Sequence, residues 1–162
     1  MDMKPRFYII MGVSGCGKSK VGKALAQRLG WDFYDADDFH PVSNIEKMAN
    51  GIPLTDEDRL PWLNALNALI AKSLQEKHQG VLACSALKEV YRQQLLSGNA
   101  DVQVVYLKGS YDLILSRMNN RTDHYMQPAM LRSQFDALEE PTYALEVDIT
   151  MPIDEIVSAI IA

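Results

Sequence analysis

The sequence predicts a doubly wound α/β fold, in which helices cover both faces of a mostly parallel, five-stranded sheet. Three observations predict this three-layer α/β/α arrangement. The apolar run Arg6-Phe7-Tyr8-Ile9-Ile10-Met11 is typical of a strand that is buried on both faces. A glycine-rich loop and an amphipathic helix follow it directly. Strand and helix patterns then alternate to the end of the chain, which indicates parallel strands joined by crossover helices.

The first half of the chain contains an insertion. A helix follows Ser19, because apolar residues recur at helical spacing as far as Gly30, which suits a helix C-cap. The second strand covers residues 31–34, and the third covers 81–84. The segment between them is far longer than one crossover helix needs. We therefore expect residues 38–79 to form a helical, substrate-binding insertion within a single domain of residues 1–162.

Two helices are expected in this insertion. The first spans residues 44–50, and the second begins at Pro61, which suits the first turn of a helix. A polar turn from Thr55 to Arg59 separates them. We also expect the polar stretch within residues 118–128 to form a mobile lid. Beyond the third strand, the alternation predicts helices at 88–96, 111–121, 128–138 and 154–161, and strands at 102–107 and 145–148.

Composition limits the kinds of partner. The 162 residues, 48% of them hydrophobic, suffice for one domain with a substantial core. A formal net charge of −5 and a pI of about 5.1 provide no basic surface for nucleic acid or anionic lipid, although a local pocket for a small anion is compatible with them. No apolar run reaches the roughly 20 residues that a membrane helix needs. The N-terminus has no signal-peptide core, so we expect a soluble, cytoplasmic protein.

The loop after the first strand fits the phosphate-binding pattern G-x-x-x-x-G-K-[ST] without a substitution. Glycines let successive backbone N–H groups point inward, the next helix directs its positive end at the same place, and Lys18 adds an ammonium group. The alternative, a glycine-rich surface turn, fits the flanking strand and helix poorly. The predicted nucleotide-binding residues are Gly12, Ser14, Gly15, Cys16, Gly17, Lys18 and Ser19.

Cys16 has two interpretations. A thiol at a helix N-terminus beside a lysine is expected to have a lowered pKa and to react with oxidants or alkylating agents. The alternative is an inert small residue at a variable loop position. Cys84 is the only other cysteine, and the spacing of the two suggests neither a disulfide framework nor a metal site.

Acidic residues follow the second strand. A phosphate loop works with magnesium, for which Ser19 supplies a hydroxyl, but the third strand ends in Cys84-Ser85 and offers no carboxylate. We therefore expect Asp35 to help hold the metal. Asp37 is expected to accept a hydrogen bond, and the proton, from the hydroxyl that attacks the γ-phosphate. The alternative is a solvated acidic turn that caps a helix.

Basic residues fall into two groups. Arg59, Lys88 and Arg92 flank the insertion and the helix after the third strand, where they are expected to bind an anionic acceptor. Arg117 and Arg121 lie one helical turn apart before the predicted lid, where they are expected to stabilise charge on the transferring phosphoryl group. Surface charge without a role is the alternative for each. His40 and His124 are further acceptor-binding candidates, with capping or packing as the alternative.

These residues resemble the small gluconokinases of the shikimate-kinase and adenylate-kinase-like branch of P-loop kinases. The likeness covers nearly the whole chain in one order. It is carried by Met11 to Ser19, Asp35-Ala36-Asp37 with His40-Pro41, Asn44 to Met48, Gly51 to Leu63, Cys84 to Lys88 with Tyr91-Arg92, His124-Tyr125, Gln134-Phe135, and Leu138 to Pro141.

The resemblance implies ATP- and Mg²⁺-dependent phosphorylation of D-gluconate on its terminal hydroxyl, giving 6-phosphogluconate, in a cytoplasmic enzyme that is often a homodimer. Two positions depart from the family pattern. Cys16 stands where serine or another small residue is usual, and the segment after Pro141 is shorter than usual, which affects any adenine contact inferred there. Two alternatives stay open: a kinase of the same fold for shikimate or a nucleoside monophosphate, and a nucleotide-binding regulatory switch, although no guanine-reading Asn-Lys-x-Asp motif is present.

Overall fold

The computed structural model describes residues 4–120 and 128–162. Its strands are β1 (Phe7–Met11), β2 (Asp32–Asp35), β3 (Gly80–Ala83), β4 (Val102–Lys108) and β5 (Leu145–Asp148). They form one sheet in the order β2-β3-β1-β4-β5, and every neighbouring pair is parallel. The predicted five-stranded, doubly wound fold is confirmed, and the sheet is parallel throughout.

The central strand β1 explains the unbroken apolar run in the sequence. It pairs with β3 on one side and with β4 on the other. Phe7, Ile9 and Met11 pack into the hydrophobic cluster on one face of the sheet, whereas Tyr8 and Ile10 pack into the cluster on the other. Because both faces are covered, alternation between polar and apolar residues is absent from this strand.

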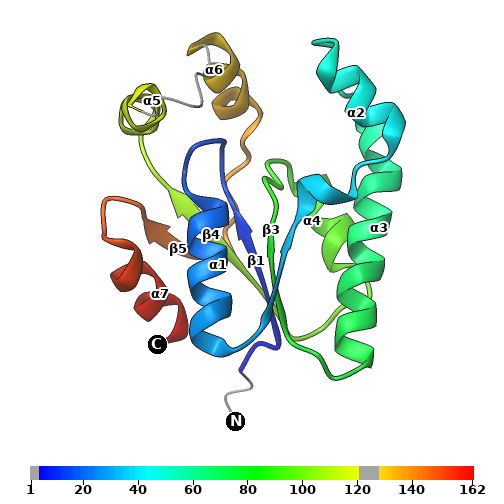
Figure 1. Ribbon diagram of the computed structural model, residues 1–162, viewed down its shortest axis with the longest axis vertical. Coiled ribbons are helices and arrows are strands. Elements are labelled where there is room, and N and C mark those ends of the chain that lie inside the picture. The colour runs from blue at the N-terminus through cyan, green and yellow to red at the C-terminus, as the bar shows by residue number, and fades with distance from the viewer. Residues whose placement is uncertain (1–3, 121–127) are drawn as a thin grey trace.

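Helices cover the two faces in separate pairs (Figure 1). They are α1 (Lys18–Leu29), η1 (a 3-10 helix, Ala36–Phe39), α2 (Val42–Ala49), α3 (Asp56–Gln75), α4 (Glu89–Leu96), α5 (Tyr111–Asn119), α6 (Pro128–Ala137) and α7 (Ile153–Ile161). α1 and α7 contact each other over one face, and α3 and α4 over the other. α2, α5 and α6 lie at the end of the molecule where the strands finish (Figure 1). None of the helices within residues 4–120 and 128–162 combines the length and apolar character that crossing a bilayer requires.

The second helix of the insertion starts earlier than predicted. Residues 56–59, predicted to form a turn, are the first turn of α3, and Pro61 lies inside the helix. A capping box explains the difference: the Asp58 N–H donates to Thr55 Oγ1 at 3.0 Å, and the Thr55 N–H donates to Asp58 Oδ2 at 2.9 Å. Lys47 of α2 donates to Asp58 Oδ1 at 2.7 Å, so the same carboxylate also ties α2 to α3.

We expect Thr55→Ala to lower the free energy of unfolding by about 1 kcal/mol, because the substitution leaves the Asp58 N–H at the helix start without its side-chain partner. Urea denaturation followed by circular dichroism measures this difference. Thr142→Ala, at an exposed position outside the helices, is the matched control. Equal stability of the two variants would contradict the proposed contribution of the cap.

Candidate active site

The phosphate loop leaves the end of β1 in a backbone conformation that requires glycine. Gly12 and Gly15 have φ angles of +152° and +81°. A Cβ atom on Gly12 would lie 2.6 Å from the Cys16 sulfur, and one on Gly15 would lie 2.6 Å from Met118. Both conformation and space therefore exclude a side chain at these two positions. The Lys18 ammonium donates to the Val13 carbonyl at 3.1 Å, which folds this side chain back along the loop.

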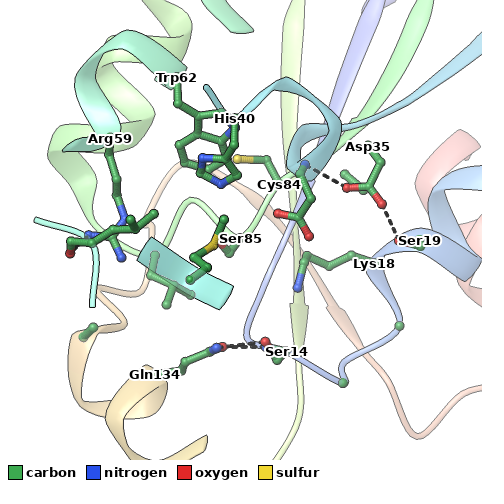
Figure 2. Close-up of a pocket in the computed structure, with 18 of the residues that line it drawn as sticks. Ser14, Lys18, Ser19, Asp35, His40, Arg59, Trp62, Cys84, Ser85 and Gln134 are labelled. Atoms are coloured by element: carbon green, nitrogen blue, oxygen red, sulfur yellow. Dashed lines mark hydrogen bonds between the residues drawn. The ribbon is translucent and has the colours of Figure 1, made fainter. Parts of the chain in front are cut away.

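Ser19 and Asp35 meet as the sequence predicts. The Ser19 hydroxyl, in the first turn of α1, donates to Asp35 Oδ2 at 3.5 Å (Figure 2). Asp35 Oδ1 accepts from the Asp37 N–H at 3.0 Å, which fixes the carboxylate at the end of β2. Within the described part of the chain, no group of three or more His, Cys, Asp or Glu side chains could enclose a metal ion. Two oxygen ligands from the protein fit Mg²⁺, which usually keeps several waters and takes oxygens from phosphate.

Asp37 has the electrostatics of a base. Desolvation by the surrounding protein raises its pKa, and the nearby Asp35 carboxylate raises it further, although the side chain itself is open to the cavity. His40 and Lys18 oppose this shift. A carboxylate whose ionised form is disfavoured binds a proton more readily, which suits a group that receives one.

One cavity of about 700 Å³ joins the phosphate loop to the insertion (Figure 2). Most of the predicted site residues line it together: Ser14, Gly15, Gly17, Lys18, Ser19, Asp35, Asp37, His40 and Arg59. The other walls come from the insertion, the end of β3 and α6, and they contribute Met48, Leu54, Trp62, Ser85, Leu87 and Gln134. The carboxyl ends of parallel strands meet at one edge of a sheet, which is why segments distant in sequence converge here.

The insertion wall is built around an aromatic stack. The centroids of the His40 and Trp62 rings are 4.2 Å apart, and the angle between the ring planes is 12°. The Trp62 indole N–H donates to the Ala36 carbonyl at 2.7 Å. Burial lowers the pKa of His40, so the neutral ring is favoured at pH 7. Asn44 Nδ2 lies 3.3 Å from His40 Nδ1, and because an amide nitrogen can only donate, Nδ1 accepts and the ring proton is on Nε2.

Arg59 is held at the cavity by two hydrogen bonds that one guanidinium nitrogen donates. Its Nη1 donates to the Leu54 carbonyl at 2.7 Å and to the Tyr91 hydroxyl at 3.3 Å. Neither Nε nor Nη2 has an acceptor in the described part of the chain. A planar pair of donors therefore remains for a ligand, and such a pair matches the geometry of a carboxylate.

The structure does not bring Lys88 and Arg92 to the cavity. The Lys88 ammonium lies 3.6 Å from Asp56 Oδ1 and over the face of the Tyr91 ring. Arg92 is only 2% exposed. It donates to the backbone carbonyls of Ala86, Leu87 and Glu139 and to the Glu89 and Tyr143 side chains. The buried position of Arg92 leaves no route to the anionic acceptor that the sequence analysis assigned to it; instead, this side chain ties together the segments that carry the cavity wall.

Arg117 lies on the other side of the phosphate loop. Its Nη2 donates to the Ile149 carbonyl at 2.8 Å. Together with Gly15, Gly17 and Lys20 it lines a second cavity of about 280 Å³, which the segment after β5 closes. Arg121, His124 and most of the predicted lid lie outside the described residues.

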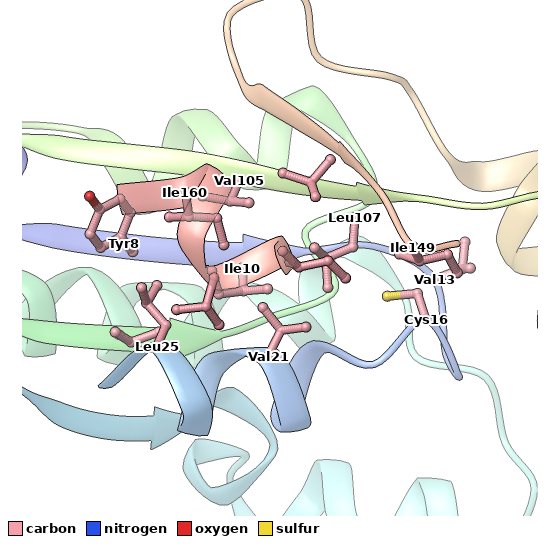
Figure 3. Close-up of a cluster of buried hydrophobic side chains, with 14 of the residues drawn as sticks. Tyr8, Ile10, Val13, Cys16, Val21, Leu25, Val105, Leu107, Ile149 and Ile160 are labelled. Atoms are coloured by element: carbon pink, nitrogen blue, oxygen red, sulfur yellow. The ribbon is translucent and has the colours of Figure 1, made fainter. Parts of the chain in front are cut away.

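The expectation of a lowered pKa for Cys16 is wrong. The side chain is 2% exposed and belongs to the hydrophobic cluster beneath α1 and α7 (Figure 3). Desolvation raises the pKa of this thiol, and the nearby Lys18 only partly opposes it. Burial therefore outweighs the effect of the helix N-terminus, and the inert interpretation holds.

Sequence reasoning missed Trp62 and Gln134 as wall residues. Both residues belong to motifs that carry the family resemblance, but the sequence pattern around them predicts only that they lie on helices. That they face the cavity follows from how α3 and α6 pack, which the residue pattern does not specify.

The phosphate loop, the Ser19–Asp35 pair and the adjoining acceptor-sized cavity define a P-loop phosphotransferase. A protein-family model for shikimate kinase matches residues 14–157. The chain is 42% identical to a probable gluconokinase of Mus musculus over 96% of both chains. It is 48% identical to the thermosensitive gluconokinase of Escherichia coli K12, over 83% of this chain and 72% of the other. A solved gluconokinase from Sinorhizobium meliloti superposes with a TM-score of 0.84 at 41% identity, over 98% of this chain and 91% of that one. The chain belongs to the gluconokinase family and is an enzyme.

We expect both cysteines of the native protein to resist a thiol reagent at neutral pH, because burial raises the pKa of Cys16 and raises that of Cys84 to about 12. Mass spectrometry after alkylation measures the labelling of each. The same protein unfolded in urea is the control, in which both should label fully. Rapid labelling of Cys16 in the native protein would contradict this expectation.

Proposed function

We propose that this chain transfers the γ-phosphoryl group of ATP to the terminal hydroxyl of D-gluconate, giving 6-phospho-D-gluconate. The observation that carries the proposal is the cavity of about 700 Å³ that is lined both by the phosphate loop and by Asp37, His40 and Arg59. One side of it suits the phosphates of a nucleotide, and the other suits a small acceptor with hydroxyl and carboxylate groups. The names of the relatives, gluconokinases from several organisms, support this acceptor.

On the donor side, the backbone N–H groups of Gly15, Gly17, Lys18 and Ser19 and the Lys18 ammonium bind the phosphates. Ser19 and Asp35 hold Mg²⁺, which when bound neutralises part of the phosphate charge. We assign the second cavity, beside Arg117, to the nucleoside part of ATP, because it adjoins the phosphate loop at Gly15 and Gly17. We assign Arg117 to binding of ATP there.

On the acceptor side, Asp37 orients the attacking hydroxyl and accepts its proton. The Nε2–H of His40 donates to a hydroxyl, and the free edge of Arg59 binds the carboxylate through two parallel hydrogen bonds. Lys18 stabilises the negative charge that develops as the phosphoryl group moves. All four groups belong to rigid elements or to segments fixed by hydrogen bonds, so the reaction partners are brought together in a defined orientation.

The proposal includes further parts that come from the sequence analysis. Arg121 and His124 act from a lid within residues 118–128, and residues 38–79 form the substrate-binding insertion. The enzyme is cytoplasmic, works as a homodimer and binds no nucleic acid. The formal net charge of −5 supports the proposal that the enzyme binds no nucleic acid.

A coupled assay of ATP consumption across acceptors tests the proposed function. We expect Mg²⁺-dependent turnover with D-gluconate and little with nucleoside monophosphates, because Arg59, His40 and Asp37 together match a carboxylate and a chain of hydroxyls. Shikimate and other sugar acids also carry these groups, and we expect less turnover with them because the relatives are gluconokinases. Turnover with one of the other acceptors and none with gluconate would overturn the proposal. Tight nucleotide binding without any acceptor-dependent turnover would instead favour a regulatory switch.

We expect Asp37→Asn to lower kcat by at least about 100-fold, the lower end of the range for loss of a general base, with a much smaller change in the ATP KM. The same substitution should stabilise the protein at pH 7. The folded-state pKa of Asp37 is raised, so ionisation of Asp37 costs stability above its unfolded-state pKa, and asparagine removes that cost.

Kinetics and thermal unfolding of the two proteins at pH 7 measure both effects. The stability difference should disappear as the pH falls below the pKa of an unfolded aspartate, about 3.9. Asp38→Asn, at the neighbouring exposed position, is the matched control. Near-normal kcat in Asp37→Asn would move the role of base to another residue.

A further inference from the structure

Gln134 joins α6 to the phosphate loop. The Ser14 N–H donates to Gln134 Oε1 at 2.7 Å, and Gln134 Nε2 donates to the Ser14 hydroxyl at 2.8 Å (Figure 2). The two residues are 120 positions apart in the sequence. Because the amide uses both of its ends on one partner, its orientation is fixed, and α6 is held to the loop by a pair of hydrogen bonds.

The same helix carries a wall of the cavity. Ser133, Gln134 and Ala137 of α6 line the space between the phosphate loop and the insertion. Gln134 is therefore the point at which this wall is bonded to the loop that binds the donor. Figure 2 shows the Gln134 side chain reaching across to Ser14 on the far side of the cavity from Asp35 and Ser19.

The segment that follows α6 is anchored independently. The Glu139 N–H donates to the Leu87 carbonyl at 2.8 Å, and Arg92 Nη2 donates to the Glu139 carbonyl at 2.7 Å. Leu87 itself lines the cavity. α6 is thus tied to the β3–α4 segment at its C-terminal end. At the cavity the Gln134–Ser14 pair bonds it to the donor loop, beside the apolar packing of Leu131 in the cluster that contains Val13. Loss of that pair would let the wall shift relative to the loop while its far end stays in place.

We propose that Gln134 is a positioning residue for phosphoryl transfer, which acts by locking the α6 wall to the phosphate loop through Ser14. The inference rests on the proposed function. In-line transfer requires the acceptor hydroxyl and the γ-phosphate to be aligned, and a misplacement of about 1 Å costs on the order of 100-fold in rate. Gln134 holds the acceptor-side wall in register with the loop that fixes the donor, so its effect falls on the chemical step rather than on the affinity for ATP.

Gln134→Met tests the proposal, since it keeps the length of the side chain and removes both hydrogen bonds. We expect kcat with gluconate to fall about 10- to 100-fold, while the ATP KM stays within about three-fold, as for a loss confined to the transition state. Asp136→Asn, at an exposed position of the same helix that is not among the residues lining the cavity, is the matched control and should retain wild-type kcat. Thermal unfolding of each variant establishes that it is folded. Unchanged kcat in folded Gln134→Met would overturn the proposal.

A double-mutant cycle distinguishes positioning through Ser14 from direct contact with substrate. Ser14→Ala removes the hydroxyl that accepts from Nε2 and leaves the backbone N–H. If Gln134 acts through Ser14, Ser14→Ala should lower kcat in the wild-type background and cost clearly less in the Gln134→Met background. Fully additive effects would mean that Gln134 acts on the substrate itself, and would overturn the proposal.

The two proposals fail in different ways. If the wild-type protein does not phosphorylate gluconate, the proposed function fails before any variant is compared. If wild-type protein turns over gluconate and Gln134→Met matches it in kcat, only the positioning role fails.

Discussion

The position of the phosphate loop depends on the burial and pairing of β1. This strand is bonded to β3 and β4, and its side chains fill the hydrophobic clusters on both faces of the sheet. Its end cannot move without disturbing both clusters, so the loop that starts at Gly12 begins from a fixed point. Gly12 and Gly15 then fit the loop closely against Cys16 and Met118. Donor binding is thereby built on a strand whose five residues are all buried.

The acceptor side is built differently, from polar ties between separate segments. Asp58 completes the capping box of α3 and accepts from Lys47 of α2, whereas Arg92 joins the β3–α4 segment to the segment after α6. A buried arginine is costly unless its donors are paired, and here they reach three backbone carbonyls and two side chains. These ties set the shape of the cavity at places where apolar packing alone would leave the segments free to shift.

The fold and the donor half of the site could be predicted from the sequence because each rests on a local pattern. The run from Arg6 to Met11 signals a doubly buried strand, and the spacing from Gly12 to Ser19 signals a phosphate loop. The start of α3 was missed because a capping box and a polar turn use the same residues. The positions of the Arg92 and Gln134 side chains could not be predicted from the sequence. Whether a long side chain faces a cavity or the protein interior depends on contacts between segments that are, in these two cases, 47 and 120 residues apart. The prediction of a lowered pKa for Cys16 failed for the same reason, because the burial of a side chain depends on segments distant in the sequence.

The stacking of His40 on Trp62 gives the enzyme an optical signal of its own. The chain has two tryptophans. Trp31 stacks on Tyr8 before the start of β2, at the end of the sheet opposite the cavity. Trp62 instead lines the cavity, and its ring stacks on His40, which lines the same cavity. An acceptor that displaces the imidazole changes the emission of Trp62 and leaves that of Trp31 as an internal reference. Occupancy of the acceptor subsite is therefore readable by fluorescence in the unmodified protein, without a label and without turnover.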